Sequence, residues 1–384
     1  MKKLIFIFIV TIISCKSPTK ESNNSKSAEI AELEASIDSL FNSKIAENEP
    51  GAAILVSYDN DILIKKGFGL RDLESKKPIT AKTNFRTGSI SKQFTSLATL
   101  SLIDKGLLSF NDSLHKFWPY PIFKDITLEH LLNHTSGLPD YEEHFQEKWN
   151  RNTIVENKNI LEWLSTNPSP LFKAGSDFEY SNTGYIVLAH LVEKVSGESF
   201  PSFVQKNIFE KSGMKKTTFY SFSKPTEINE RAYCYKKDSL GNWEKVDGNF
   251  MDGIMGGGGM YTNIDDYFTY NSALDSTSIL SGDMHDLIFK PNSPLVPKNE
   301  GYEFNFLNGK QQQYGMGWFV TDKTALHGGS WNGARAMVVK ELEKPLTIVL
   351  FLNFDSSEIR NDLTESTYLL VEKYLKTAAN NIHK

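Results

Sequence analysis

Cysteine is nearly absent from this sequence, which has only Cys15 and Cys234 among its 384 residues. If Cys15 is modified during processing at the N-terminus, no intrachain disulfide can form, and the fold must be held by its core. The composition supplies such a core, because 40% of the residues are hydrophobic and 12% are aromatic. These proportions also argue against a globally disordered chain.

A basic stripe is also missing, and the formal net charge is −5. Nucleic acid is therefore not an expected partner, since its recognition depends on clustered Lys and Arg. Neither a Gly-x-Ser-x-Gly elbow nor a His-Glu-x-x-His pair occurs, which argues against an α/β-hydrolase and a zinc peptidase. His130 and His134 have zinc-like spacing, but the acidic residue of that motif is not between them, so we expect no metal and no cofactor.

Four consecutive glycines, Gly256 to Gly259, are not followed by the Lys-Ser/Thr of a phosphate-binding loop. Such a run permits backbone conformations that other residues do not tolerate. It can line a pocket or turn a corner, and we interpret it as a turn with close packing.

The longest almost wholly apolar run, residues 4–13, lies at the N-terminus and follows Lys2 and Lys3. This pattern predicts a secretory signal peptide over residues 1–14, too short for a finished membrane span. The stretch Ile12-Ile13-Ser14-Cys15 resembles a bacterial lipobox, in which the cysteine is acylated and becomes the new N-terminus. The alternative is ordinary cleavage with Cys15 incidental.

The predicted mature chain has a polar lipidated tether over residues 15–27 and one domain over residues 28–384. We therefore expect an exported protein that is lipid-anchored to a bacterial membrane and faces the periplasm or the cell surface. The membrane is a partner only through this anchor.

Within the domain, β-rich ends flank a mostly helical middle. The ends are expected to pair into one antiparallel sheet, giving an α/β (α+β) fold in which the sheet is flanked by helices. The α/β lobe is predicted over about 28–88 and 312–384, and the inserted helical lobe over about 89–311. The individual elements expected are helices at 28–47, 89 onward, 127–133, 159–165, 182–195, 200–211 and 363–375, and strands at 52–58, 61–68, 231–237, 243–246, 317–320, 334–339 and 346–353.

Ser89 and Lys92 are three residues apart at the start of a predicted helix, so their side chains share a face of its first turn. A serine hydroxyl is a weak nucleophile until a base takes its proton. A lysine can be that base when burial or neighbouring cations lower its pKa. This motif alone is weak evidence, because Ser-x-x-Lys recurs by chance and both residues have ordinary structural roles.

Two further motifs support the Ser-Lys pair. Tyr180-Ser181-Asn182 lies where a loop enters a helix; there a tyrosine can relay protons, and an asparagine amide can bond both the lysine and a substrate carbonyl. His327-Gly328-Gly329-Ser330 ends a β run, where glycines let a substrate backbone approach closely. The amide of Ser330 can complete an oxyanion hole with that of Ser89.

The ordered motifs Ser89-x-x-Lys92, Tyr180-Ser181-Asn182 and His327-x-Gly329 resemble the serine β-lactamase-like hydrolases. That family includes class C β-lactamases, DD-carboxypeptidases and certain esterases. The stretches Leu131–Leu138 and Gly258–Thr262 also resemble it, so the resemblance covers roughly residues 30–375. It implies that Ser89 forms an acyl-enzyme, that Lys92 and Tyr180 share the acid–base work, and that Asn182, His327, Gly329 and Ser330 bind substrate.

Position 327 bears on the substrate, because many members of the family have a lysine there as a permanent cation. A histidine is largely neutral near pH 7 unless its pKa is raised, which weakens the case for an efficient β-lactamase. Arg335, on the following predicted strand, is a candidate for the missing cation; the alternative is an arginine on the strand surface.

We expect a serine hydrolase that acts through an acyl-enzyme on an amide or ester in a small molecule or a peptide, such as a cell-wall peptide. DD-carboxypeptidase-like and esterase-like activities fit best. Two alternatives stay open: a true β-lactamase, and a non-catalytic penicillin-binding sensor or scaffold that keeps the pocket without turnover.

Overall fold

A seven-stranded antiparallel sheet carries the fold of the computed structural model, which describes residues 20–382. The predicted signal peptide and Cys15 lie outside the described residues, and no helix among those described is long and apolar enough to cross a membrane. Across the sheet the order is β10-β11-β12-β13-β14-β1-β2. These strands are β1 (Ala52–Tyr58), β2 (Asp61–Phe68), β10 (Gln313–Tyr314), β11 (Phe319–Val320), β12 (Thr324–Trp331), β13 (Ala334–Glu341) and β14 (Leu346–Leu352).

The two ends of the chain meet in this sheet, as the sequence predicted. β1 pairs with β14 in antiparallel register from Ala52 opposite Leu352 to Tyr58 opposite Leu346. The turn between β1 and β2 is made by Asp59 and Asn60, both with positive φ, which suits the twist of a two-residue hairpin. All the residues of β14 are buried, which explains its continuous apolar sequence.

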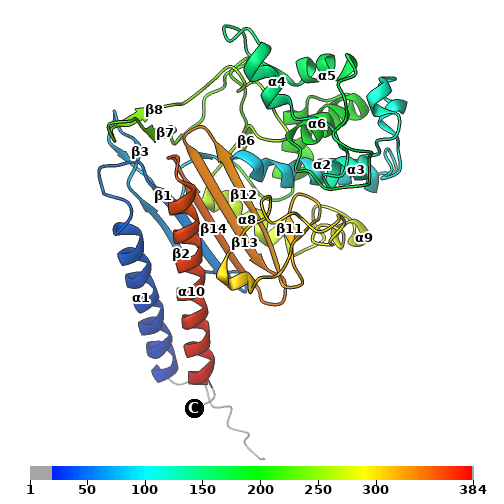
Figure 1. Ribbon diagram of the computed structural model, residues 1–384. Coiled ribbons are helices and arrows are strands. Elements are labelled where there is room, and N and C mark those ends of the chain that lie inside the picture. The colour runs from blue at the N-terminus through cyan, green and yellow to red at the C-terminus, as the bar shows by residue number, and fades with distance from the viewer. Residues whose placement is uncertain (1–19, 383–384) are drawn as a thin grey trace, which may run out of the picture.

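Helices cover both faces of the sheet. α1 (Lys20–Asn42) and α10 (Ser357–Ile382) lie side by side on one face (Figure 1). α8 (Ile264–Leu274) packs against β1 and β14 from the other face, although it falls within the range predicted for the helical lobe. α1 begins at Lys20, inside the predicted tether.

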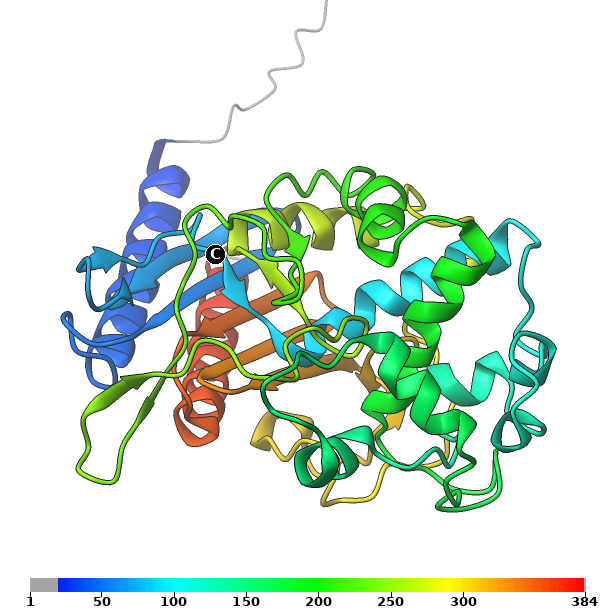
Figure 2. The ribbon, with the colours of Figure 1, turned by 90° about the horizontal axis from the view of Figure 1, so that it is seen from above.

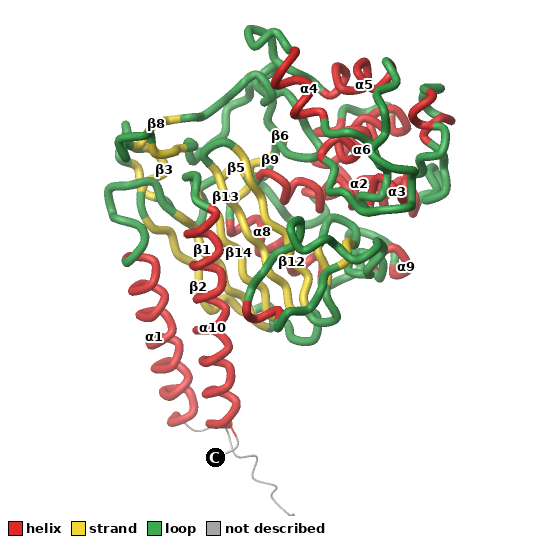
Figure 3. The backbone as a smooth tube through the Cα atoms, in the orientation of Figure 1, coloured by secondary structure: helices red, strands yellow, loops and turns green. Residues whose placement is uncertain are grey.

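The helical lobe lies beside the sheet, and Figures 2 and 3 show its helices gathered at that side, with the large sheet and helices α1 and α10 at the other. A helix at 141–148 was not predicted, and the predicted helix at 200–211 continues as a π-helical turn over Gln205–Phe209. The helices of this part are α2 (Ser91–Asp104), α3 (Leu128–Leu132), α4 (Tyr141–Lys148), α5 (Asn157–Ser165), α6 (Asn182–Ser196) and α7 (Phe200–Val204), with α9 (Gly282–His285) further along the chain.

Short strand pairs complete the fold and lead into the segment that carries Ser89. β5 (Phe85–Arg86) pairs with β9 (Met260–Thr262), which also pairs with β6 (Thr218–Phe219). The remaining pairs are β3 (Leu70–Asp72) with β4 (Lys77–Pro78), and β7 (Tyr235–Lys237) with β8 (Trp243–Lys245). The β7–β8 hairpin was predicted, but its first strand is shorter than expected.

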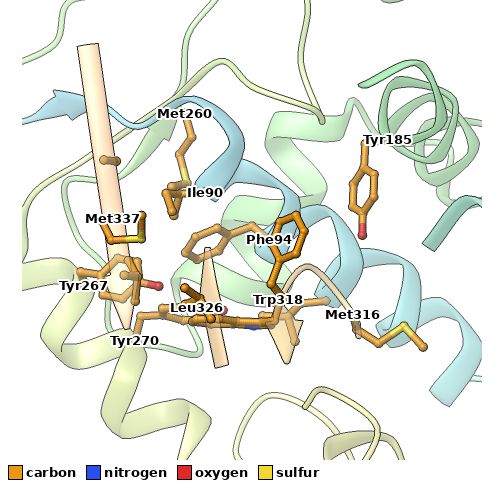
Figure 4. Packing of buried hydrophobic residues seen from close by; sticks show 14 of the residues in the cluster. Ile90, Phe94, Tyr185, Met260, Tyr267, Tyr270, Met316, Trp318, Leu326 and Met337 are labelled. Atoms are coloured by element: carbon orange, nitrogen blue, oxygen red, sulfur yellow. The ribbon is translucent and has the colours of Figure 1, made fainter. Parts of the chain in front are cut away.

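The core reaches from the sheet to α2 and α8. Phe94 and Ile90 project from the start of α2 and the turn before it toward Leu326 of the sheet and Tyr270 of α8 (Figure 4). The rings of Phe94 and Tyr270 have centroids 4.4 Å apart. This packing holds the segment that carries Ser89 rigidly between the sheet and the helical lobe.

Candidate active site

Ser89 lies in a 3₁₀ turn, Gly88–Ile90, that leads directly into α2. Gly88 has φ of +52°, a conformation that favours glycine. Lys92 lies in the first turn of α2, and its Nζ is 3.1 Å from Ser89 Oγ. The structure therefore brings the two side chains together, as their spacing predicted.

Lys92 is fully buried, and its Nζ donates to Asn182 Oδ1 at 2.7 Å and to the carbonyl of Gly257 at 2.9 Å. Burial lowers the pKa of Lys92 to about 7, although Glu142 and Asp140 act to raise it. Near neutral pH a large fraction of this amine is therefore uncharged and can accept a proton.

Tyr180 stands beside the same pair. Lys92 Nζ is 4.8 Å from the centre of its ring, and its hydroxyl interacts with Ser89. Burial raises the pKa of Tyr180 well above its ordinary value, so the phenol stays protonated. Glu300 accepts a hydrogen bond from the backbone amide of Tyr180 at 2.8 Å, and the ring of His134 packs 4.4 Å from that of Tyr180.

His134 has a structural role. Its Nδ1 accepts a hydrogen bond from the backbone amide of Ser181 at 3.0 Å. Ser181 in turn is the N-cap of α6 and accepts from the amide of Gly184. The Tyr-Ser-Asn motif is thus fixed at the helix start by its own cap and by a buried imidazole.

Asn182 connects Lys92 to an acidic residue that the sequence analysis missed. Its Oδ1 accepts from Lys92, and its Nδ2 donates to Glu142 Oε1 at 3.1 Å. Glu142 lies in the first turn of α4, where Asp140 is the N-cap. Burial and the neighbouring Asp140 raise the pKa of Glu142, and Lys92 opposes that increase.

Strand β12 packs closely against the turn that carries Ser89. A Cβ on Gly329 would lie 1.9 Å from the carbonyl oxygen of Thr87, and a Cβ on Gly88 would lie 2.7 Å from the backbone N and O of Ser330. Only glycines permit this approach. The backbone of Ser330 therefore neighbours that of Ser89, as an oxyanion hole made by their two amides requires.

His327 is buried on β12, and both ring nitrogens are engaged. Nδ1 is 2.6 Å from the carbonyl of Gly328, so it carries the proton; Nε2 then accepts from the hydroxyl of Tyr314 at 3.0 Å. Burial, together with the charges of Lys92 and Arg360, lowers the pKa of His327 to about 3. The imidazole is neutral and cannot replace a cationic lysine.

Arg335 does not supply that cation either. It lies opposite Ser330 on β13, but its guanidinium pairs with Asp355 and also donates to Ser357 and to the carbonyls of Trp331 and Ala334. The expectation that Arg335 serves the site is not supported, because its donors are already used by these partners.

A cavity with about 430 Å³ of empty space opens beside Ser89. Met251, Ile254 and Trp331 contribute apolar surface to its wall, beside polar groups such as Asn182 and Glu142, and the glycine run that we interpreted as a turn also lines it. That interpretation was incomplete, because Gly257 also accepts the hydrogen bond from Lys92. The lining residues are Arg86, Gly88, Ser89, Tyr141, Glu142, Asn182, Met251, Ile254, Gly257, Gly258, Gly259 and Trp331.

Other chemistry-bearing side chains are engaged elsewhere. Cys234 is buried, and burial raises the pKa of its thiol, so it is not an activated nucleophile. His130 Nδ1 accepts from the amide of Thr127 and closes the capping box of α3. Glu142 gave no sequence signal of its own, because an acidic residue in a first helical turn is common.

Comparison with known proteins agrees with this arrangement. The family model described as Beta-lactamase matches residues 37–371. Penicillin-binding protein 4* of Bacillus subtilis is 30% identical over 332 residues, which cover 83% of this chain and 71% of that protein. The chain belongs to the β-lactamase family.

Two solved structures share the fold. A penicillin-binding protein from Bacillus halodurans has a TM-score of 0.74 at 24% identity, covering 87% of this chain and 98% of that one. The D-amino acid amidase from Ochrobactrum anthropi has a TM-score of 0.73 at 20% identity, covering 92% and 100%. With the family established, this protein is a serine hydrolase that acts on amide or ester bonds.

Proposed function

We propose that Ser89 is the nucleophile and that Lys92, in its neutral form, is the base that activates it. The observation that carries this proposal is the position of Lys92 Nζ, 3.1 Å from Ser89 Oγ in a buried environment that lowers its pKa to about 7. Ser89 Oγ attacks the substrate carbonyl while its proton passes to Lys92. The amides of Ser89 and Ser330 hold the resulting oxyanion.

Tyr180 is proposed to deliver a proton to the leaving group. Its raised pKa keeps the phenol protonated, and its hydroxyl interacts with Ser89, beside the bond that breaks. The phenol gives its proton to the departing amine or alcohol and regains one from Lys92, which leaves an ester on Ser89. Water then attacks this acyl-enzyme, releasing the acid and restoring Ser89 and neutral Lys92.

The substrate class that we propose is a short D-amino-acyl peptide or amide, as expected for a DD-peptidase-like enzyme. The cavity beside Ser89 is small, and Met251, Ile254 and Trp331 give it an apolar part that suits an acyl group with a compact side chain. Relatives named as penicillin-binding proteins and as a D-amino acid amidase support this choice. Burial lowers the pKa of His327 to about 3, and a neutral imidazole at this position weakens the case for an efficient β-lactamase.

Simple esters are a second candidate class. Neither His327 nor Arg335 offers a free cation for a substrate carboxylate, and an ester needs none. A non-catalytic penicillin-binding scaffold is disfavoured, because the Ser89–Lys92–Asn182 contacts are complete.

Hydrolysis of p-nitrophenyl acetate and of D-alanyl-D-alanine separates these possibilities, with Ser89→Ala as the test variant. Ser39→Ala, on the exposed side of α1, is the matched control. We expect Ser89→Ala to lose both activities and Ser39→Ala to keep them. Ester hydrolysis alone would identify an esterase, and p-nitrophenyl acetate turnover that survives in Ser89→Ala would contradict the proposal.

We also propose that the protein is exported and acylated at Cys15. The sequence of residues 1–15 supports this. Helix α1 begins at the end of the molecule remote from the helical lobe (Figure 1), so a tether there would leave the cavity beside Ser89 open. Metabolic labelling with palmitate should mark the wild-type protein and not Cys15→Ser; equal labelling of both would contradict it.

A further inference from the structure

Glu142 is the one acidic residue among the described residues that line the cavity beside Ser89. Its Oε1 accepts from Asn182 Nδ2 at 3.1 Å and from the hydroxyl of Tyr141 at 3.3 Å. The carboxylate is therefore held in place at the cavity wall, and its side chain is half-buried rather than solvated. A fixed, partly desolvated charge facing a substrate cavity selects among ligands by their charge.

The other charged residue of the lining does not compensate Glu142. Arg86 forms a buried ion pair with Asp252, with 2.5 Å between Nη2 and Oδ1. Trp331 Nε1 also donates to that oxygen, at 2.7 Å. The charges of Arg86 and Asp252 therefore cancel each other within the cavity wall.

Lys92 compensates Glu142 only while it is protonated. The form of the enzyme that can activate Ser89 has a neutral Lys92, and in that form no charge on Lys92 opposes the carboxylate of Glu142, whose pKa is raised by burial and by Asp140. A cationic group on the substrate would restore neutrality in the reactive state. Once Lys92 has taken the proton of Ser89, Glu142 stabilises the new ammonium through Asn182.

The position of the acyl group matches this requirement. In an amino-acyl enzyme, the α-nitrogen is separated from Ser89 Oγ only by the carbonyl carbon and Cα. It therefore lies near the cavity that Ser89 and Glu142 both line. Met251, Ile254 and Trp331 supply an apolar wall for the side chain of the acyl residue.

We infer that Glu142 binds the α-ammonium group of the acyl residue, so that the preferred substrates are amino-acyl amides or short peptides with a free α-amino group. This inference rests on the proposed acyl-enzyme at Ser89 and narrows its substrate class. Residues within a peptide, whose α-nitrogen is acylated, bring no charge to Glu142 and are poorer substrates.

The test compares kcat/KM for D-alanyl-p-nitroanilide and its N-acetyl derivative in the wild type, Glu142→Gln and Glu143→Gln. Glu143 is the exposed neighbour on the same helix and serves as the matched control. The ratio of the two values cancels any general loss of activity. We expect the wild type and Glu143→Gln to favour the free amine by about ten- to a hundredfold, the range for a hydrogen bond to a charged group, and Glu142→Gln to show a ratio near one.

A second readout distinguishes binding from a merely structural role. A bound ammonium lowers the pKa of Lys92 in the enzyme–substrate complex. For the substrate with a free amine, the acid limb of the kcat profile should therefore lie at lower pH than the acid limb of the kcat/KM profile, and for the N-acetyl substrate the two limbs should coincide. A wild-type ratio near one, or a high ratio unchanged in Glu142→Gln, would overturn the inference.

The controls also separate this inference from the function on which it rests. If neither anilide is turned over while p-nitrophenyl acetate is hydrolysed in a Ser89-dependent way, the inference fails and the acyl-enzyme stands. If ester hydrolysis persists in Ser89→Ala, the proposed function itself fails.

Discussion

The pH dependence of kcat/KM tests the role of Lys92 directly. An ordinary lysine, with a pKa near 10.5, is neutral in only about one molecule in 3000 at pH 7. Burial lowers the pKa of Lys92 to about 7, so about half of the molecules carry a neutral amine at that pH. Because the neutral form is the active one, kcat/KM should rise tenfold per pH unit below about pH 6 and level off above about pH 8.

Hydrolysis of p-nitrophenyl acetate, corrected for the spontaneous reaction, is a suitable assay. The two histidines of the site do not titrate near neutrality, because burial lowers the pKa of His327 to about 3 and that of His134 well below its ordinary value. Glu142 acts to raise the pKa of Lys92. Glu142→Gln should therefore move the acid limb to lower pH, which assigns the limb to Lys92.

Three results would refute this reasoning. A limb below about pH 5 would indicate that a carboxylate is the base, and a limb near pH 10 would indicate that Lys92 is not perturbed. A limb near pH 7 that does not move in Glu142→Gln would indicate that the titrating group is not Lys92.

Three further predictions concern stability. Lys92 binds a proton more weakly in the folded state than in the unfolded state. The free energy of unfolding of the wild type, relative to that of Lys92→Met, should therefore increase between about pH 7 and pH 10.5, by at most about 1.4 kcal/mol per pH unit. A difference that does not change with pH in urea titrations would contradict this prediction. Asp252→Asn leaves Arg86 buried without its partner and should cost about 3–5 kcal/mol in the same assay, so an unchanged midpoint would be incompatible with that ion pair. Gly329→Ala should lower the melting temperature by several degrees, because the added Cβ would clash with the backbone of Thr87. Gly282→Ala, with open space around its Cβ, should not, and equal effects would exclude the clash as the cause.

Local patterns in the sequence predicted much of the fold. The bounds of β1 and β2 follow from β-rich runs around Asp59-Asn60, and the matching apolar run of β14 identified its partner. The lobe to which a helix belongs is harder to predict, because it depends on contacts between distant segments. α8 packs on the sheet although it falls within the range predicted for the helical lobe.

The candidate site was predicted where spacing determines geometry. Ser89 and Lys92 are close because they are three residues apart at the start of a helix, and Asn182 joins them from α6. Long-range pairing could not be predicted in the same way. Glu142 reaches Asn182 from another helix, and Arg335 is bound by Asp355, a partner that its own strand does not indicate.

The central claim is a covalent acyl-enzyme at Ser89, and intact mass spectrometry with peptide mapping tests it most directly. Wild type and Ser89→Ala would be acid-quenched shortly after mixing with p-nitrophenyl acetate, and in parallel after exposure to a penicillin. We predict that the wild type gains the mass of one acyl group on the peptide that contains Ser89, and that Ser89→Ala gains none. An adduct of equal amount in Ser89→Ala, or one mapped to another residue of the wild type, would contradict the claim.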